Sequence, residues 1–351
     1  MTEVNGVGFG AGVDYGDSQS ALIRHHLESV LERASRRKCL TSGELFDRAR
    51  LFMPPVREAV PDIAQEIDGI AQGAGLDREA AWLLQLRAEV FRVDTGSVPA
   101  ECTSFGVAPS RRPAGTIAGQ NADLPPFYQN VVVLVRRRIP YKPTVLTLTP
   151  AGQVGWHGMN SSGVAVFANF LYSDGWRPGV PRYLFTRIAL ESNHARDAAR
   201  RLISMDRGSS RNLLLADETE VLDLELAVGE WGIDEASDGY VVHANHHVSR
   251  ISSREQAPEE YLRNSRARHS RMEELVGESG PEFDVVDATR ILRDRAGLPD
   301  PLCRAPEDHS EDDDTITVAS TVADIANRAL WIAIGPPHMG TYHVYEVEPA
   351  A

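Results

Sequence analysis

The sequence has 351 residues, of which 42% are hydrophobic and 25% are charged, a balance typical of a folded protein with a large core. Its formal net charge of -14 disfavours non-specific binding to nucleic acid, because an acidic surface repels the phosphate backbone. No run approaches the roughly 18 apolar residues that a membrane helix needs, and the first residues have neither the basic start nor the apolar core of a secretory signal. We therefore expect a cytoplasmic protein that binds no membrane.

Helical periodicity dominates the first hundred residues. Apolar residues recur on one side of residues 17–38, and two further helices are expected after Asp62 and Asp77, each with an aspartate as its N-terminal cap. Glycines are expected to end the first of these two helices. Residues 94–101 contain Gly and Pro, which break the pattern and predict an exposed linker.

After Cys102 the period of the apolar residues changes from that of helices to that of strands. The expected strands are residues 103–108, 114–119, 131–137, 143–149, 153–157, 163–168, 212–216, 221–227, 239–244, 315–322, 329–334 and 341–347, and the expected helices are residues 181–205, 257–276 and 285–297. Strands grouped on both sides of helical blocks favour the α+β class, with two packed sheets covered by helices.

The three cysteines, Cys39, Cys102 and Cys303, are an odd number at wide spacing, which fits neither a disulfide scaffold nor a zinc site. Cys39 and Cys303 have the context of ordinary buried thiols. Cys102 differs, because it follows the linker signal and opens a predicted strand. Its chemistry therefore needs a separate explanation.

Three further motifs follow this cysteine. The sequence GQNAD (119–123) ends an expected strand, where Asn and Asp usually form a turn. The sequence GMNSSG (158–163) lies between two strands and could direct backbone N–H groups towards a ligand, although many hairpins contain glycine. The sequence HANHH (243–247) offers three imidazoles to a metal, but alternation along a strand would split them between two faces. Each motif alone is a weak signal.

In this order and spacing, Cys102 and the three motifs resemble the N-terminal-nucleophile hydrolases of the acyl-coenzyme A:6-aminopenicillanic acid acyltransferase group, the C45 autoproteolytic acyltransferase/hydrolase family. Residues 66–89, 179–192 and 329–347 extend the resemblance along nearly the whole chain. It implies a single domain of residues 1–351, built as a four-layer αββα sandwich of two antiparallel sheets covered by helices. It also implies self-cleavage of one peptide bond, which would leave residues 1–101 and 102–351 as a heterodimer.

The resemblance also implies roles for individual residues. Cys102 becomes the N-terminal nucleophile, and Asp123 holds its new α-amino group. The side-chain amide of Asn245 supports the oxyanion, and Asn160 offers a backbone N–H to the same oxygen, as in the related conjugated bile acid hydrolases. Ser320 matches the late serine of the family.

The residue before the nucleophile departs from the family pattern. Glu101 stands where the penicillin-forming acyltransferase has glycine. This difference puts the rate of cleavage in question more than its occurrence. The cleavage site is therefore expected at the Glu101–Cys102 bond.

The chemistry explains why these residue types are needed. A free α-amino group has a pKa near 8, so it can serve as the base for its own side-chain thiol without a partner histidine. The expected activity is hydrolysis of a small-molecule N-acyl substrate through a thioester, without metal or cofactor. The alternative is transfer of the acyl group to an amine, with a coenzyme A thioester as co-substrate. Hydrolysis is favoured because water is always present, and homo-oligomer formation is left open.

Two other functions compete with this reading. An inactive member of the family would serve as a binding protein, but it would lack the nucleophile or the amide, and both are present here. A metal-dependent hydrolase would use His243, His246 and His247, and would lose activity with a chelator. The aromatic residues of the central strands, which could line an acyl pocket or simply fill the core, are Trp156, Phe167, Phe170, Tyr172 and Trp176.

Overall fold

A computed structural model describes residues 1–38, 40–92, 101–308 and 314–347. Cys39 and all but the last residue of the expected linker 94–101 lie outside the described residues. The helices are α1 (Gly8–Ser18), α2 (Ser20–Lys38), α3 (Ser42–Arg50), α4 (Met53–Ala59), α5 (Pro61–Ala74), α6 (Arg78–Gln85), α7 (Arg87–Arg92), α8 (Arg182–Ala189), α9 (Ala195–Ser204), α10 (Glu259–Gly277) and α11 (Val285–Leu292). The strands are β1 (Thr2–Asn5), β2 (Glu101–Val107), β3 (Ile117–Leu124), β4 (Val132–Arg138), β5 (Val145–Pro150), β6 (His157–Asn160), β7 (Ala165–Phe170), β8 (Arg211–Ala216), β9 (Val221–Leu226), β10 (Trp231–Asp234), β11 (Tyr240–His243), β12 (Ile316–Asp324), β13 (Ala329–Ile334) and β14 (His343–Glu346).

The strands form two sheets. The larger sheet has the order β1-β4-β5-β6-β7-β8-β9-β10, and the smaller has the order β11-β2-β3-β12-β13-β14. All neighbouring pairs are antiparallel except β1 and β4, which run parallel. The two antiparallel sheets expected from the sequence are therefore confirmed, with this one parallel pair as the exception.

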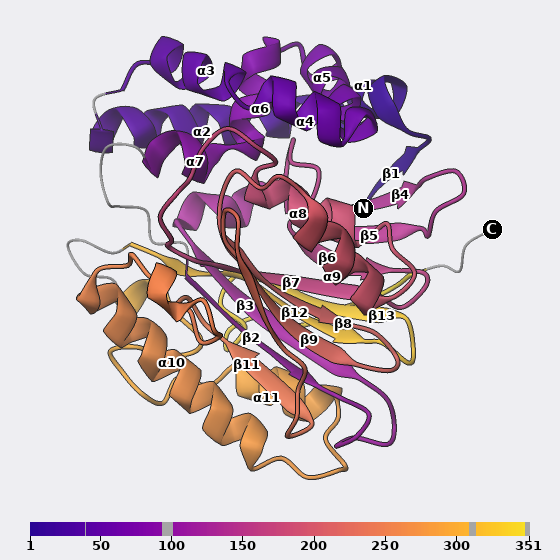
Figure 1. The fold of residues 1–351 in the computed structure, drawn as a ribbon, viewed down its shortest axis with the longest axis vertical. Helices are drawn as coiled ribbons and strands as arrows, with labels where there is room; N and C mark the ends of the chain where they lie inside the picture. The colour runs from indigo at the N-terminus through magenta and orange to yellow at the C-terminus, as the bar shows by residue number, and fades with distance from the viewer. Residues whose placement is uncertain (39, 93–100, 309–313, 348–351) are drawn as a thin grey trace.

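The two sheets pack face to face and helices cover both outer faces, so the molecule has four layers (Figure 1). Strand β2 contacts β7 and β8 across the interface, which joins the sheets at their centre. Helices α8 and α9 cover the larger sheet, and α10 and α11 cover the smaller one. The αββα sandwich is thereby confirmed. In the part of the chain that the structure describes, no helix is both long and apolar enough to cross a membrane.

The amino-terminal helices form a compact block above the larger sheet (Figure 1). Helices α1 and α5 approach so closely that a Cβ built on Gly12 would lie 2.0 Å from the carbonyl oxygen of Glu66, and one on Gly69 would lie 2.1 Å from that of Phe9. Real Cβ atoms do not make such contacts, so glycine is required at both positions. The close packing of α1 on α5 joins them within the amino-terminal helical block.

The helix expected at residues 181–205 is in fact two helices, α8 and α9. The Nδ2 group of Asn160 donates hydrogen bonds to the carbonyl oxygens of Leu190 at 2.8 Å and Ser192 at 2.7 Å. These bonds satisfy carbonyl groups at and beyond the C-terminal end of α8 that have no partner within the helix. The carboxylate of Asp217 then accepts the backbone N–H of Ala195 at 2.9 Å, so that α9 begins anew. The apolar period alone predicts one continuous helix. Hydrogen bonds from Asn160 and Asp217, which lie elsewhere in the sequence, divide it into two.

Candidate active site

Cys102 lies near the start of β2, on the face of the smaller sheet that packs against the larger one. Its side chain belongs to the apolar core between the sheets and is only 5% exposed. Strands β3 and β11 flank β2, and Ala122 of β3 is the register partner of Cys102. The backbone of the cysteine is therefore fixed within a paired strand.

Asn245 reaches Cys102 because β11 runs antiparallel to β2. His243, the last residue of β11, pairs with Ser104, so the chain leaving β11 passes Cys102 two residues later. There Oδ1 of Asn245 accepts the backbone N–H of Cys102 at 2.8 Å, while its Nδ2 donates to the carbonyl of Phe170 at 3.0 Å. Cys102 and Asn245, both predicted from the sequence, therefore contact each other through the backbone N–H of the cysteine and the side-chain oxygen of the asparagine.

Arg268 is a further member of this site, which the sequence motifs did not reveal. It lies on α10, which covers β2 and β11, and its side chain is fully buried. Its guanidinium donates to the carbonyl of Cys102 at 2.9 Å, to Oγ1 of Thr103 at 2.7 Å and to Oδ1 of Asn245 at 3.0 Å. No motif of the sequence points to Arg268, because its contacts depend on how α10 packs over β2 and β11.

Asn169 contacts the site from the facing sheet. Its Nδ2 donates to the carbonyls of Cys102 at 3.1 Å and His243 at 3.2 Å, and its Oδ1 accepts the hydroxyl of Ser104 at 2.7 Å. One side chain of β7 therefore holds both β2 and β11 at the level of the thiol.

Asp123 is buried on β3, one position beyond the register partner of Cys102. Its Oδ1 accepts the hydroxyl of Thr317 at 2.6 Å, and that hydroxyl accepts the backbone N–H of Arg304 at 2.9 Å. Burial, and after it the charge of Asp123, raise the pKa of the Cys102 thiol to about 12. At neutral pH the thiol is therefore protonated in this structure and needs a base before it can attack.

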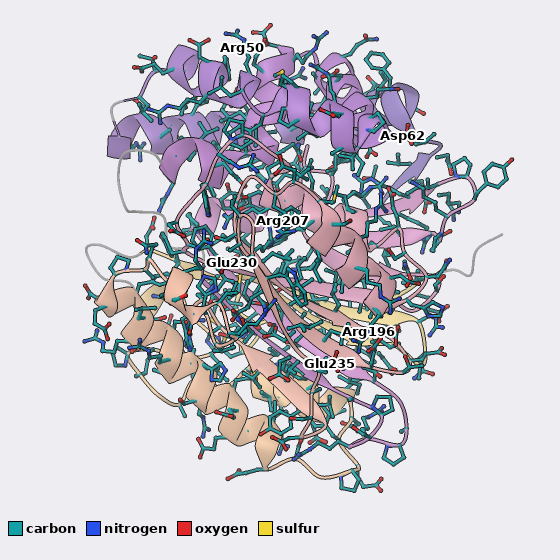
Figure 2. All side chains as sticks on the ribbon, in the orientation of Figure 1. Arg50, Asp62, Arg196, Arg207, Glu230 and Glu235 are labelled. Carbon is teal, nitrogen blue, oxygen red and sulfur yellow. The ribbon has the colours of Figure 1, made fainter. Side chains whose placement is uncertain are left out.

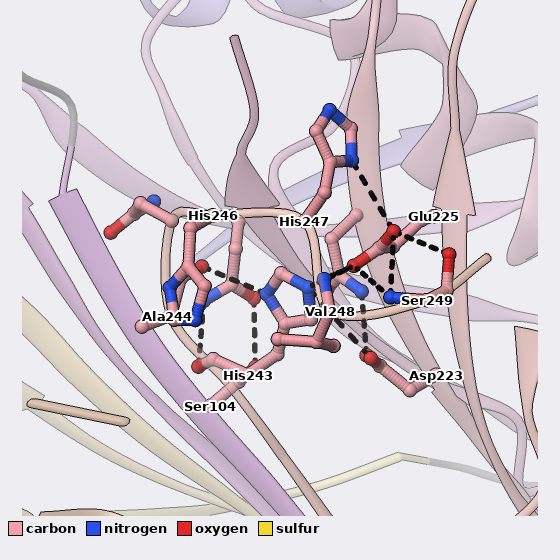
Figure 3. A network of polar contacts seen from close by, with 12 residues as sticks. Ser104, Asp223, Glu225, His243, Ala244, His246, His247, Val248 and Ser249 are labelled. Atoms are coloured by element: carbon pink, nitrogen blue, oxygen red, sulfur yellow. Dashed lines mark hydrogen bonds and ion pairs between the residues drawn. The ribbon is translucent and has the colours of Figure 1, made fainter. Parts of the chain in front are cut away.

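The buried carboxylate of Glu225, on β9, fixes the loop that follows β11 (Figure 3). Its oxygens accept from Nε2 of His243 at 3.0 Å, from Nδ1 of His247 at 3.2 Å, and from the backbone N–H of Val248 and the hydroxyl of Ser249, both at 2.6 Å. Because this loop carries Asn245, which contacts the backbone of Cys102, the carboxylate positions that amide indirectly.

Opposite charges explain the protonation of this network. Burial alone would lower the pKa of His243, but Asp223 and Glu225 outweigh it and raise that pKa to about 9. Burial alone would raise the pKa of Glu225, but the hydrogen bonds from His243 and His247 hold it below its ordinary value. His243 is therefore an imidazolium at neutral pH, beside a carboxylate.

The three histidines of this segment do not meet at one point. His246 turns away from Glu225: its Nδ1 bonds to the hydroxyl oxygen of Ser265 at 2.7 Å, and its ring packs against His269. Among the residues that the structure describes, no group of three or more His, Cys, Asp or Glu side chains is arranged to hold a metal ion. Their hydrogen bonds to Glu225 and Ser265 instead hold the loop after β11 in place.

Asn160 is not brought to the thiol. Its Nδ2 holds the end of α8, and its backbone N–H donates to the carbonyl of Val164 at 2.9 Å within the β6–β7 turn. Both donors are engaged away from Cys102. The oxyanion contact expected of its backbone N–H is therefore not available in this geometry.

Ser320 also lies away from the thiol, on the opposite face of its sheet. Cys102, Ala122 and Ala319 are in register across β2, β3 and β12 and share the face between the sheets. Ser320 is the next residue of β12, so its side chain faces the outer helical layer, where it bonds to the hydroxyl of Tyr342 at 2.6 Å. Because of this alternation, Ser320, the match to the late serine of the family, does not lie beside the thiol of Cys102.

A narrow cavity of about 10 Å³ lies beside the thiol, with room for about one water molecule. Its lining is Cys102, Leu124, Trp156, Ala168, Phe170, Arg182, Tyr183 and Arg211. Two of the five aromatic residues considered for an acyl pocket, Trp156 and Phe170, are part of this lining. An acyl group can enter only if the cavity widens.

Two packed sheets between helical layers are the architecture expected of N-terminal-nucleophile hydrolases. The family model described as acyl-coenzyme A:6-aminopenicillanic acid acyl-transferase matches residues 110–338, and the chain belongs to this family. The match begins beyond Cys102, so the case for the nucleophile depends on the geometry around β2.

Individual relatives are similar along most of the chain. The 40 kDa form of acyl-coenzyme A:6-aminopenicillanic-acid-acyltransferase from Emericella nidulans is 29% identical over 303 residues, which cover 85% of this chain and 82% of the relative. A solved Caenorhabditis elegans ortholog of N-acylethanolamine-hydrolyzing acid amidase is 16% identical, with a TM-score of 0.46 over 64% of this chain and 93% of its own. Penicillin V acylase from Agrobacterium tumefaciens is 12% identical, with a TM-score of 0.47 over 69% of this chain and 84% of its own.

Proposed function

We propose that this protein is a cysteine amidohydrolase that cleaves its own chain and then hydrolyses the C–N bond of a small N-acyl substrate. The observation that carries the proposal is the 2.8 Å hydrogen bond from the backbone N–H of Cys102 to Oδ1 of Asn245. When the Glu101–Cys102 bond is cut, this nitrogen becomes the α-amine of a new chain. An amide oxygen is already in place to hold it.

The maturation step uses the thiol of Cys102. Its sulfur attacks the carbonyl carbon of Glu101, the peptide C–N bond breaks, and the thiol proton passes to the leaving nitrogen. Water then hydrolyses the resulting thioester and leaves a free carboxylate on Glu101. The thiol pKa of about 12 supports this order, since the cysteine is a weak nucleophile while its own nitrogen belongs to a peptide.

In the mature enzyme the α-amine of Cys102 is the base. It accepts the thiol proton as sulfur attacks the substrate carbonyl, and Asp123 and Oδ1 of Asn245 hold the resulting ammonium. The C–N bond of the substrate then breaks, the amine leaves with that proton, and water hydrolyses the thioester. The Nδ2 donor of Asn245, which the motif predicts for the oxyanion, bonds to the carbonyl of Phe170 at 3.0 Å in this structure, so the amide oxygen carries the role proposed here for Asn245.

The two fragments are expected to stay together as a heterodimer. Residues of α5 and α6 share one apolar core with residues of α8 and the larger sheet. Cleavage before Cys102 does not touch that core. Localisation in the cytoplasm stays a prediction of the sequence.

Acyl transfer is the second candidate, because both the family description and the name of the Emericella nidulans relative specify an acyl-coenzyme A-dependent acyltransferase. The two activities share the thioester and differ in whether water or an amine resolves it. With an acyl-coenzyme A donor and an added amine, a transferase yields the N-acyl product, whereas a hydrolase yields free acid.

A substrate panel tests the proposed function. Wild-type protein is expected to release acid and amine from N-acyl amides, and Cys102→Ala is expected to be inactive. Cys303→Ala is the control for loss of a buried thiol, because Cys303 is also buried and its sulfur contacts Nδ1 of His338 rather than Asn245 or the backbone of Cys102. Full activity of Cys102→Ala would refute the proposal.

A further inference from the structure

Two buried arginines share the cavity with the thiol of Cys102. Arg182 is the first residue of α8 and Arg211 is the first residue of β8, and both line the cavity. They are only 2% and 4% exposed. The fold therefore holds two guanidinium groups close to the proposed nucleophile.

These guanidinium groups contact aromatic rings rather than acids. That of Arg182 lies 3.9 Å from the ring centre of Phe170 and 4.9 Å from that of Tyr183, and that of Arg211 lies 5.0 Å from the ring centre of Tyr183. Their hydrogen bonds are long, 3.3 Å from Arg182 to the hydroxyl of Tyr183 and 3.4 Å from Arg211 to the carbonyl of Arg182. Within the described residues neither arginine forms an ion pair, and Nε of each has no hydrogen-bond partner.

The nearby acid does not neutralise the pair. Oε1 of Glu89, on α7, accepts the backbone N–H of Arg182 at 3.1 Å and the hydroxyl of Ser209 at 2.6 Å. Burial, and after it the charge of Arg182, lower the pKa of Arg211 to about 10, so the group remains a cation at neutral pH. Glu89 raises that pKa in turn, but one carboxylate can balance only one of two buried cations, and within the described residues it forms no ion pair with either arginine.

We infer that Arg182 and Arg211 form a subsite for a carboxylate of the substrate, and that the substrates are N-acyl compounds with a carboxylate close to the scissile bond, such as N-acyl α-amino acids. The inference rests on the proposed function, which places the amide carbonyl at Cys102. A planar guanidinium binds a carboxylate through two parallel N–H donors. Since both arginines and the thiol line one narrow cavity, the recognised charge lies within a few bonds of the carbonyl carbon.

A pair of substrates of matched shape tests the subsite. One is an N-acyl amino acid and the other is its neutral carboxamide, and the readout is the ratio of their kcat/KM values. Wild-type enzyme is expected to favour the acid by about tenfold or more. Arg182→Gln and Arg211→Gln are each expected to bring the ratio close to one, mainly through KM for the acid, while Arg211→Lys retains part of the preference.

Arg200→Gln is the control, because it removes one positive charge from an exposed position of α9 and should keep the wild-type ratio. The ratio compares two substrates on one protein, so partial loss of folding lowers both values alike. Equal kcat/KM values in wild type, or a preference that survives both glutamine substitutions, would overturn the subsite and leave the amidohydrolase intact. Turnover that survives Cys102→Ala would instead overturn the proposed function.

Discussion

Asn245 shows how one side chain differs from its expected role. The motif predicts an amide nitrogen that supports an oxyanion, but the structure places Oδ1 against two donors, Cys102 N–H and the guanidinium of Arg268. Two donors at one end of an amide require its oxygen there. The contact seen here is therefore suited to holding the nitrogen of the nucleophile.

Substitution of Asn245 distinguishes an acceptor from a donor. Asn245→Ala is expected to lower kcat by about 100-fold, since the nitrogen of Cys102 then loses the acceptor that positions it. Asn245→Asp keeps an acceptor of the same shape and is expected to retain more self-cleavage than the alanine variant. Asn193→Ala, at an exposed position, is the control. Equal cleavage of the alanine and aspartate variants, by intact mass, would show that the acceptor is unimportant.

Arg268 is expected to support both folding and activity. Arg268→Met removes three hydrogen bonds from buried acceptors, and each acceptor left without a donor costs about 1–3 kcal/mol. The variant should unfold at lower denaturant concentration and cleave itself more slowly. Arg266→Met, on the exposed side of the same helix, should match wild type in both measurements. An Arg268→Met protein as stable as wild type would contradict this role.

The site residues divide into those that local motifs reveal and those that they do not. Cys102, Asp123 and Asn245 each belong to a short motif of the family, so the sequence points to them, and their catalytic roles remain part of the proposal. Arg268 and Glu225 could not be predicted, because their roles depend on how α10 and β9 pack around β2 and β11. Asn160 and Ser320 do not lie beside Cys102, for physical reasons. A hydrogen bond within the β6–β7 turn engages the backbone N–H of Asn160, and strand alternation directs the side chain of Ser320 to the outer helical layer.

At the scale of elements, the loop after β11 depends on the carboxylate of Glu225. Glu225→Gln removes the charge that orients His243 and His247, and we expect kcat to fall about tenfold with little change in KM, because the loop then holds Asn245 less firmly. Glu230→Gln, at an exposed position on the turn after β9 (Figure 2), is the control. A Glu225→Gln enzyme with wild-type kcat would refute the positioning role.

The same network predicts how stability depends on pH. The pKa of His243 is raised on folding from 6.5 to about 9, so its contribution to stability is complete below pH 6.5, declines as pH rises and is lost above about pH 9. Thermal unfolding of the Cys102→Ala chain, in which the Cys102 thiol is absent, should show Tm falling between these values. The fall should be smaller when Glu225→Gln is added. A Tm that rises over this range would contradict the assignment.

The pair of helices α1 and α5 makes a second prediction about elements. Gly69→Ala would place a methyl group against the carbonyl oxygen of Phe9, and such overpacking is expected to cost about 3 kcal/mol in the free energy of unfolding. Gly10→Ala on α1 is the control, since nothing lies within 4 Å of the added atom and alanine favours a helix. Denaturant unfolding should show opposite signs for the two variants. Equal stability of both variants would mean that the helices separate easily.

The sequence predicts most elements, and its errors occur where distant contacts decide. Short apolar runs bounded by Gly and Pro place most strands within a few residues, because these strands are buried on both faces. The strand expected at residues 153–157 is an exception, because β6 begins only at His157. The apolar pattern cannot show that Asn160 and Asp217 interrupt residues 181–205, since these partners come from other strands and turns. It also omits the helices α1, α3 and α4 and the strands β1 and β10, which are short and lie at the edges of the larger sheet.

At the scale of the whole molecule, the four layers explain how one chain can become two and remain folded. The expected cut lies at the start of β2, at the edge of the core between the sheets, while the amino-terminal helices pack against α8 and the larger sheet. Surface ion pairs, such as that of Arg196 with Glu235 (Figure 2), tie α9 to the end of β10 within the second fragment. After the proposed cleavage, the amino-terminal helices are expected to keep their contacts with α8 and the larger sheet.

Intact mass measurement of the purified protein during turnover of an N-acyl substrate tests the central claim most directly. The account predicts two masses, residues 1–101 and 102–351, with the larger fragment transiently heavier by one acyl group. The Cys102→Ala protein is expected to give a single mass and no adduct. A wild-type chain that stays whole and yet hydrolyses the substrate would contradict the account.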